Sequence, residues 1–301
     1  MTERIGMLGL GVMGAAFAKH LHKAGFELTG YDPVPARRVA FKRLGGTSVT
    51  SVAAAARNPV LITSLPNAAA VADVAAQIAK SARRGTLVIE TSTMPIAVKE
   101  AARRLLAKKG ITLLDCTVSG TGAQARLKDL VVFASGPKGH VQRLKPVFEG
   151  FSKSHFYVGA FGAGSKMKFI ANLLVTIHNV STAEAIVMGK RAGLDPALVI
   201  EAVAGGAGGS RMLQMRGPLM AEARYTNPTA TINVLQKDIG IITEFAREYS
   251  CPTPLFSVAT QFYNAAAALG YAEQDPAVVC EVLDRWAGTS PVKKSTRRRR
   301  R

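Results

Sequence analysis

Short apolar runs alternate with longer amphipathic or alanine-rich stretches over roughly the first 160 residues. The runs are rich in valine, isoleucine and leucine, which predicts short buried strands. Helices are predicted between them, as at 68–82 and 96–109. The predicted strands cover 4–10, 27–32, 60–65, 86–92, 111–118, 130–135 and 155–158. This alternation predicts an α/β half built on a doubly wound parallel sheet.

The pattern changes after Gly164, where the strand-like runs stop. No clear helix breaker occurs from Ser165 to about Ala192, which predicts one long helix. Beyond it the chain is predicted to be helical, with breaks at glycines and prolines that include Pro218. We therefore expect four segments: a dinucleotide-binding domain at 1–161, an interdomain helix at 162–192, an all-helical domain at 193–289 and a basic tail at 290–301.

The segment GLGVMG at 9–14 separates the first predicted strand from the first helix. Its glycines fit the G-x-G-x-x-G turn of a Rossmann-type domain: Gly9 allows the tight turn, Gly11 lets a pyrophosphate approach, and Gly14 lets helix pack on strand. The predicted cofactor contacts here are Gly9, Leu10, Gly11, Val12, Met13 and Gly14. The competing interpretation is a secretory signal over 1–21, but Glu3 beside Arg4 and three glycines disfavour it.

An acidic residue, Asp32, ends the second predicted strand, 18 residues after Gly14. A carboxylate in this place accepts hydrogen bonds from the ribose hydroxyls and repels a 2′-phosphate, which favours NAD over NADP. Arg37 and Arg38 follow closely and weaken that preference, so NADP is kept as the alternative. The other interpretation of Asp32 is an ordinary turn before Pro33.

Composition is that of a globular protein, with 48% hydrophobic and 20% charged residues. No uncharged apolar run reaches the roughly 18 residues that a membrane-spanning helix needs. The three cysteines lie far apart and form neither a metal-binding spacing nor a disulfide framework. We expect a reduced, cytoplasmic protein without a bound metal.

The formal net charge is +19, and seven of the basic residues fall in the segment SPVKKSTRRRRR at 290–301. This segment has no apolar face to bury, which predicts a disordered tail. The remaining charge suits anionic substrates and cofactors. Nucleic acid is not expected as a partner beyond nonspecific binding to the tail, because the basic residues lack interleaved aromatic side chains.

The long helix offers a candidate for acid–base chemistry. In GAGSKMKFIAN at 162–172, Lys168 and Asn172 are four residues apart and so share a helix face. An amide can orient a substrate hydroxyl while an amine exchanges its proton, provided that burial lowers the pKa of the lysine. The plainer interpretation is a surface lysine beside a helix-capping asparagine.

Several blocks taken together resemble the β-hydroxyacid dehydrogenase family, which includes 3-hydroxyisobutyrate and 6-phosphogluconate dehydrogenases. The resemblance covers roughly residues 3 to 287. It implies a cofactor role for GLGVMG and for the loops SLPN at 64–67 and ETSTMP at 90–95, with Leu65, Pro66 and Thr93 in the contacting positions. We also expect a homodimer or homotetramer in which the long helix packs against its mate, because an alanine-rich helical half needs a partner for its exposed apolar face.

The resemblance assigns roles to the remaining blocks. In TVSGTGAQA at 117–125, Ser119 and Gly120 stand where the family grips the substrate carboxylate. Lys168 stands at the position of the catalytic acid/base and Asn172 at that of its partner. In LQKDI at 235–239, Lys237 stands where it reaches the cofactor and substrate.

The chain departs from the family pattern in the substrate block. Thr117 replaces a proline, and Thr121, Gln124 and Lys128 replace glycines, so we expect larger polar side chains to line this loop. Ala230 replaces a phenylalanine that is often found near the lysine–aspartate pair, which predicts a larger site. Val175 stands where the decarboxylating enzymes carry a glutamate, so no acid-assisted decarboxylation is expected.

These observations predict an NAD-dependent oxidoreductase that interconverts a small 3-hydroxy acid and its aldehyde or keto form. Two alternatives remain open on the sequence alone. One is an imine or other carbonyl reductase on the same scaffold, which the presence of Lys168 disfavours. The other is a dinucleotide-binding scaffold without catalysis that recruits partners through the basic tail.

Overall fold

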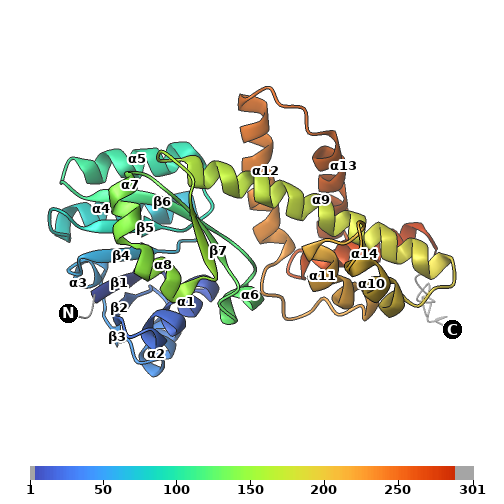
Figure 1. The fold of residues 1–301 in the computed structure, drawn as a ribbon, viewed down its shortest axis with the longest axis horizontal. Helices are drawn as coiled ribbons and strands as arrows, with labels where there is room; N and C mark the ends of the chain where they lie inside the picture. The colour runs from blue at the N-terminus through green and yellow to red at the C-terminus, as the bar shows by residue number, and fades with distance from the viewer. Residues whose placement is uncertain (1–3, 289–301) are drawn as a thin grey trace, which may run out of the picture. The chain divides into compact units, whose positions relative to one another are not determined.

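The computed structural model describes residues 4–288, and the chain divides into two compact units with a boundary after Ala171. The boundary falls inside the helix α9, Ala163–Arg191, so this helix contributes to both units. The predicted basic tail at 290–301 lies outside the described residues. Figure 1 shows the elements of both units.

The first unit is built on one eight-stranded sheet with the order β3-β2-β1-β4-β5-β6-β7-β8. Its strands are β1 Arg4–Leu8, β2 Glu27–Tyr31, β3 Thr47–Ser48, β4 Val60–Thr63, β5 Leu87–Glu90, β6 Thr112–Ser119, β7 Val131–Ser135 and β8 Ser154–Tyr157. The strand order reverses at β1, with β2 on one side and β4 on the other, as in a doubly wound sheet. The predicted Rossmann-type α/β architecture is therefore confirmed.

Helices cover both faces of this sheet (Figure 1). They are α1 Val12–Lys23, α2 Pro35–Arg43, α3 Val52–Ala55, α4 Ala68–Ser81, α5 Ile96–Ala107, α6 Gly122–Arg126, α7 Lys138–Arg143 and α8 Lys145–Phe151. Helix α1 packs with α6 and α8, whereas α4 packs with α3 and α5. Neighbouring strand residues face opposite cores: Ile62 packs in the first group and Leu61 in the second. Burial on both faces explains why the strands are nearly continuous apolar runs.

Two features of the sheet differ from the sequence prediction. Strand β3 has two residues, Thr47 and Ser48, too short and too polar to produce an apolar run. Strand β7 runs antiparallel to β6, whereas the other neighbouring pairs are parallel. The parallel doubly wound sheet predicted from the sequence is confirmed except at this pair, because an apolar run determines burial but not strand direction.

The second unit is helical. Beyond α9 it contains α10 Pro196–Ala204, α11 Arg211–Ala221, α12 Ile232–Glu248, α13 Pro254–Ala268, the 3₁₀ helix η1 Pro276–Val278 and α14 Val279–Trp286. The break predicted at Pro218 was wrong, since Pro218 lies inside α11. Helix α11 buries Met212, Leu213 and Met220. This burial offsets the free-energy cost of the backbone hydrogen bond that proline cannot donate.

Helix α9 is long and apolar, with a mean hydropathy of 1.3 over its most apolar 18 residues. Among the described helices, it alone would suffice to cross a bilayer by length and composition. However, several of its buried polar side chains have hydrogen-bond partners in the protein. Asn179 donates from Nδ2 to the hydroxyl of Tyr263 and to the carbonyl of Pro276, at 3.0 and 2.9 Å. This pairing is typical of a helix that packs against other helices.

Candidate active site

The glycine loop between β1 and α1 has the geometry that its sequence predicts. Gly9 has a φ of +92°, and a Cβ added there would lie 2.2 Å from the carbonyl oxygen of Ser64. A Cβ on Gly14 would lie 2.0 Å from the carbonyl oxygen of Gly9. Both positions therefore need glycine, the first for a turn and the second for close packing of helix on strand.

Gly11 differs, because a Cβ added there would meet no atom within 4 Å. Gly11 is the N-cap of α1, and no side chain accepts a hydrogen bond from the first turn of that helix. An open space in front of uncapped helix N–H groups is what an approaching pyrophosphate requires. These residues fit the dinucleotide that the sequence implies.

Asp32 follows β2 and is held on both oxygens. Its Oδ2 accepts from the backbone N–H of Leu10 and its Oδ1 from that of Val34, each at 2.9 Å. Arg37 lies 3.3 Å away and forms an ion pair with it. The nearby Arg38 donates to the backbone carbonyl of Asp32 at 2.6 Å. Asp32 is therefore more than a turn residue: its carboxylate ties the end of β2 to the glycine loop.

Loops after β4 and β5 meet beside this glycine loop. The N–H of Ser64 donates to the carbonyl of Leu8 at 2.9 Å, which joins the ends of β4 and β1. The N–H of Leu65 donates to the hydroxyl of Ser92 at 2.8 Å, which joins the ends of β4 and β5. Leu65, Pro66 and Thr93 thus lie on loops at the carboxyl edge of the sheet, where ligands of such folds bind.

The predicted substrate block follows at the end of β6. Ser119 is the last residue of that strand, and Gly120 adopts a φ of +136°, a conformation that favours glycine. Thr121 and Gln124 form a capping box at the start of α6, through Thr121 Oγ1 with the N–H of Gln124 and Gln124 Oε1 with the N–H of Thr121.

The residues that depart from the family pattern thus have structural partners. Gln124 also donates to Asp129 at 3.2 Å, and Thr117 donates to the carbonyl of Gly164 at 2.7 Å. Lys128 adopts a φ of +61° in the left-handed region that a glycine would favour. Thr117 and Gln124 stabilise the loop through these bonds.

Lys168 and Asn172 lie on successive turns of α9, and both are buried, with exposures of 8% and 7%. The alternative interpretation of Lys168 as a surface lysine is therefore wrong. Lys168 belongs to the first unit and Asn172 begins the second. Burial removes water from the amine, which is a requirement for a lysine that acts as a base.

Asn172 is held by a residue that was not singled out in the sequence. Its Nδ2 donates to Oδ2 of Asp238 at 2.8 Å, and Lys237 Nζ lies 3.2 Å from the other oxygen of Asp238. Asp238 and Lys237 are neighbours on α12, and Asp238 is buried. The motif LQKDI contains Asp238 directly after Lys237, so the aspartate could have been predicted as a site residue together with the lysine.

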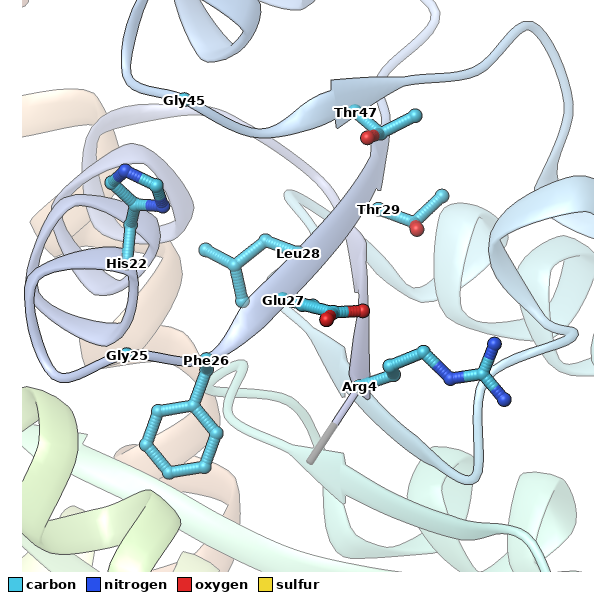
Figure 2. Close-up of a pocket in the computed structure, with 9 residues that line it drawn as sticks. All are labelled: Arg4, His22, Gly25, Phe26, Glu27, Leu28, Thr29, Gly45 and Thr47. Atoms are coloured by element: carbon cyan, nitrogen blue, oxygen red, sulfur yellow. The ribbon is translucent and has the colours of Figure 1, made fainter. Parts of the chain in front are cut away.

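Two other features lie outside this candidate site. A cavity of about 360 Å³ opens at the amino ends of β1, β2 and β3, beside Arg4, Glu27 and Thr47 (Figure 2). The glycine loop follows the carboxyl end of β1, at the opposite edge of the sheet.

Within residues 4–288, no group of three His, Cys, Asp or Glu side chains could hold a metal ion. Burial and the neighbouring Asp115 raise the pKa of Cys116, which disfavours the thiolate that a nucleophile requires.

Two family models from known proteins together match most of the described chain. Residues 4–159 match a family model described as the NAD binding domain of 6-phosphogluconate dehydrogenase. Residues 162–283 match a model for the NAD-binding region of NADP-dependent 3-hydroxyisobutyrate dehydrogenase.

Individual relatives agree over nearly the full length. L-threonate dehydrogenase of Cupriavidus necator is 33% identical over 288 residues, covering 94% of this chain and 97% of that protein. The mitochondrial 3-hydroxyisobutyrate dehydrogenase of Mus musculus is 30% identical, covering 93% and 86%. The crystal structure of 3-hydroxyisobutyrate dehydrogenase from Salmonella typhimurium superposes with a TM-score of 0.85 at 28% identity, covering 93% and 99%.

Proposed function

The chain belongs to the β-hydroxyacid dehydrogenase family, NAD(P)-dependent oxidoreductases that act on CH–OH groups, and from this membership we propose that it interconverts a small 3-hydroxy acid and its aldehyde or keto form. One observation carries the proposal: a buried amine and a buried amide occupy successive turns of α9, and Asp238 fixes the amide. Alcohol oxidation requires that the protein supply a group that transfers the proton and a group that orients the substrate.

The bound cofactor supplies the hydride acceptor at its nicotinamide ring. In our proposal Lys168 takes the proton from the substrate hydroxyl in the oxidative direction and returns it to the developing alkoxide in reverse. Asn172 orients the reacting oxygen, while the Ser119 hydroxyl and the Gly120 N–H bind the carboxylate. Lys237 assists in binding both ligands. Val175 offers no proton, so the reaction stops without decarboxylation.

The cofactor-binding residues follow from the loop geometry. Backbone N–H groups at 11–14 would hold the pyrophosphate, and Asp32 would accept hydrogen bonds from the adenosine ribose. Leu65, Pro66 and Thr93 would line the path toward the nicotinamide. We propose NAD as the preferred cofactor because the Asp32 carboxylate opposes a 2′-phosphate, even though Arg37 partly neutralises it.

The second part of the proposal is a homodimer or a pair of dimers. Met167, Ile170 and Leu174 are exposed by 39%, 54% and 47%, and their spacing puts them on one stripe of α9. An apolar stripe of this kind favours burial against another surface, and a second copy of the same helix offers a matching one.

A substrate panel tests the proposed reaction. Purified protein would be offered short 3-hydroxy acids, among them 3-hydroxyisobutyrate and L-threonate, with NAD and with NADP side by side. We expect turnover of at least one acid that falls by about 100-fold or more in Lys168→Ala, the range for loss of a general base. No turnover above that of Lys168→Ala would instead favour a dinucleotide-binding scaffold.

A further inference from the structure

Lys99 is a fully buried ammonium on the core-facing side of α5. Its Nζ lies 2.7 Å from Oε2 of Glu90 and 2.8 Å from Oδ1 of Asp115. Glu90 and Asp115 are paired across β5 and β6, and both are buried as well. The two carboxylates outweigh the effect of burial, which alone would disfavour the charge, and they raise the pKa of Lys99. The ammonium therefore stays charged inside the domain.

One arm of this ion cluster reaches the start of α9. Oδ2 of Asp115 accepts from the backbone N–H of Ser165 at 2.7 Å, and Oδ1 accepts from the Ser165 hydroxyl at 3.0 Å. Ser165 is in the first turn of α9, three residues before Lys168. An anion at this position is favoured by the helix dipole, which helps to explain how two carboxylates share one lysine.

The other arm reaches the loop that follows β5. Oε1 of Glu90 accepts from the backbone N–H of Ser92 at 3.0 Å. The Ser92 hydroxyl in turn accepts from the N–H of Leu65 at 2.8 Å. Thr93, a predicted cofactor contact, is the next residue. Through the two carboxylates, a single ammonium is thus linked to the loops at 64–67 and 90–95 and to the first turn of α9, three residues before Lys168.

We propose that Lys99 is a positioning residue: through Asp115 and Glu90 it sets the first turn of α9, and with it Lys168, and the loop that carries Thr93. The proposal rests on the proposed function for the roles of Lys168 and Thr93. An apolar residue at 99 could fill the same space on the core-facing side of α5, since buried ion clusters are not generally more stable than well-packed apolar groups. A role in holding two segments accounts for the cluster better than stability does.

The chemistry of removal supports the same conclusion. Without Lys99, Glu90 and Asp115 face each other as two buried carboxylates, and one of them must take up a proton. A protonated Asp115 is a weaker acceptor than the carboxylate, so its two bonds to Ser165 lose their charge-assisted strength. A protonated Glu90 would likewise hold the N–H of Ser92 less strongly than the carboxylate does. Either outcome displaces a segment that the reaction needs.

The test compares Lys99→Met with Val88→Ala. Methionine keeps most of the side-chain volume and removes the charge. Val88 is buried in β5 and is uncharged, so its truncation weakens the same region without removing a member of the ion cluster. Amide hydrogen exchange by mass spectrometry, without cofactor, would be read at 91–95 and 163–168. We expect faster exchange in both segments for Lys99→Met relative to the rest of the unit, and a uniform change for Val88→Ala.

Kinetics provide the second measurement, at a temperature at which both variants are folded. We expect kcat of Lys99→Met to fall by about 10- to 100-fold, as a displacement of roughly 1 Å near the reacting groups produces. The Kd for NAD should change by much less, because the glycine loop and Asp32 do not contact the cluster. Val88→Ala should keep the parent kcat.

The outcomes separate the two proposals. Exchange and kcat of Lys99→Met that match those of Val88→Ala would overturn the positioning role. If the parent turns over no 3-hydroxy acid, the proposed function fails, and the exchange data alone decide whether Lys99 holds the two segments. Should Lys99→Met not fold, Asp115→Asn replaces it, since it leaves one lysine facing one carboxylate. It should then speed exchange at 163–168 but not at 91–95, and equal rates at both would overturn the proposal.

Discussion

Asn172 and Asp238 are joined by a hydrogen bond of 2.8 Å between two buried side chains. A carboxylate can only accept, so the amide nitrogen of Asn172 must face Asp238, and the amide oxygen must face elsewhere. Asp238 therefore decides which end of the Asn172 amide is available to a ligand. Its other oxygen lies 3.2 Å from Lys237 Nζ, which fixes the carboxylate in turn.

Truncation of Asp238 should leave the Asn172 amide without the partner that orients it. In Asp238→Ala the buried Asn172 amide loses its acceptor, a loss of about 1–3 kcal/mol in comparable cases. We expect kcat/KM to fall by roughly 10- to 100-fold, at about 1.4 kcal/mol for each factor of ten. Steady-state kinetics would measure it, and Asp238→Asn, which keeps an acceptor oxygen, should lose less. Equal losses in the two variants would contradict an orienting role.

The glycine loop allows cofactor binding to be separated from folding. Gly11→Ala adds a methyl group into space with no atom within 4 Å, so the melting temperature should stay within about 1 °C of the parent. If that space admits the pyrophosphate, the Kd for NAD should rise by about tenfold or more.

Gly14→Ala is the matched control for that experiment. Its new Cβ would lie 2.0 Å from a backbone oxygen, so the loop must distort and the melting temperature should fall by several degrees. Calorimetry and NAD titration of both variants give the result. A Gly11→Ala protein that binds NAD as the parent does would place the pyrophosphate elsewhere.

Cofactor preference should depend on the pair formed by Asp32 and Arg37. Asp32→Asn removes the charge that opposes a 2′-phosphate and releases Arg37, 3.3 Å away, to bind it. We expect kcat/KM with NADP to rise by about tenfold relative to that with NAD, in line with a charge contribution of roughly 1–2 kcal/mol. The double variant Asp32→Asn/Arg37→Ala should lose that gain. An unchanged ratio in Asp32→Asn would mean that Asp32 does not face the ribose.

The sequence predicted what local patterns encode. Strands with Ile62 or Ile89 were found because both faces of the sheet are buried, so apolar residues run without interruption. The turn at Gly9 was found because few residues other than glycine adopt its backbone conformation.

Relationships across the chain were not found in this way. Lys99 is 16 residues from Asp115 in the sequence, and only the fold brings the two together. A lone lysine at a helix position is usually solvated, so the sequence did not indicate that Lys99 is buried. Asp238 is 66 residues from Asn172, and no periodicity connects the two. The direction of β7 and the continuation of α11 through Pro218 likewise depend on packing partners that are distant in the sequence, so local patterns could not predict them.

Self-association should depend on the exposed stripe of α9. Leu174→Glu puts a charge among Met167 and Ile170, and burying it against a second copy would be strongly unfavourable. We expect the parent to elute as a dimer or tetramer and Leu174→Glu to shift toward the monomer, as measured by light scattering after size exclusion. The exposed Leu255→Glu on α13 serves as a control for added charge. A monomeric parent would contradict the proposed assembly.

Alkaline pH should weaken the helical unit through two buried groups. Burial raises the pKa of Cys280 from 9.0 to about 11 and that of Tyr263 from 10.0 to about 12. Both folded-state values exceed the unfolded ones, so the native state keeps its protons longer; the stabilisation is complete below about pH 9 and is lost between about pH 9 and 12. For Cys280 the loss is on the order of 2 kcal/mol.

In Cys280→Ala the free energy of unfolding should be lower at pH 7, because packing is lost, yet it should decline less steeply between pH 9 and 11. Urea unfolding at each pH measures both slopes, and parallel slopes for variant and parent would show that this thiol does not titrate as its burial predicts.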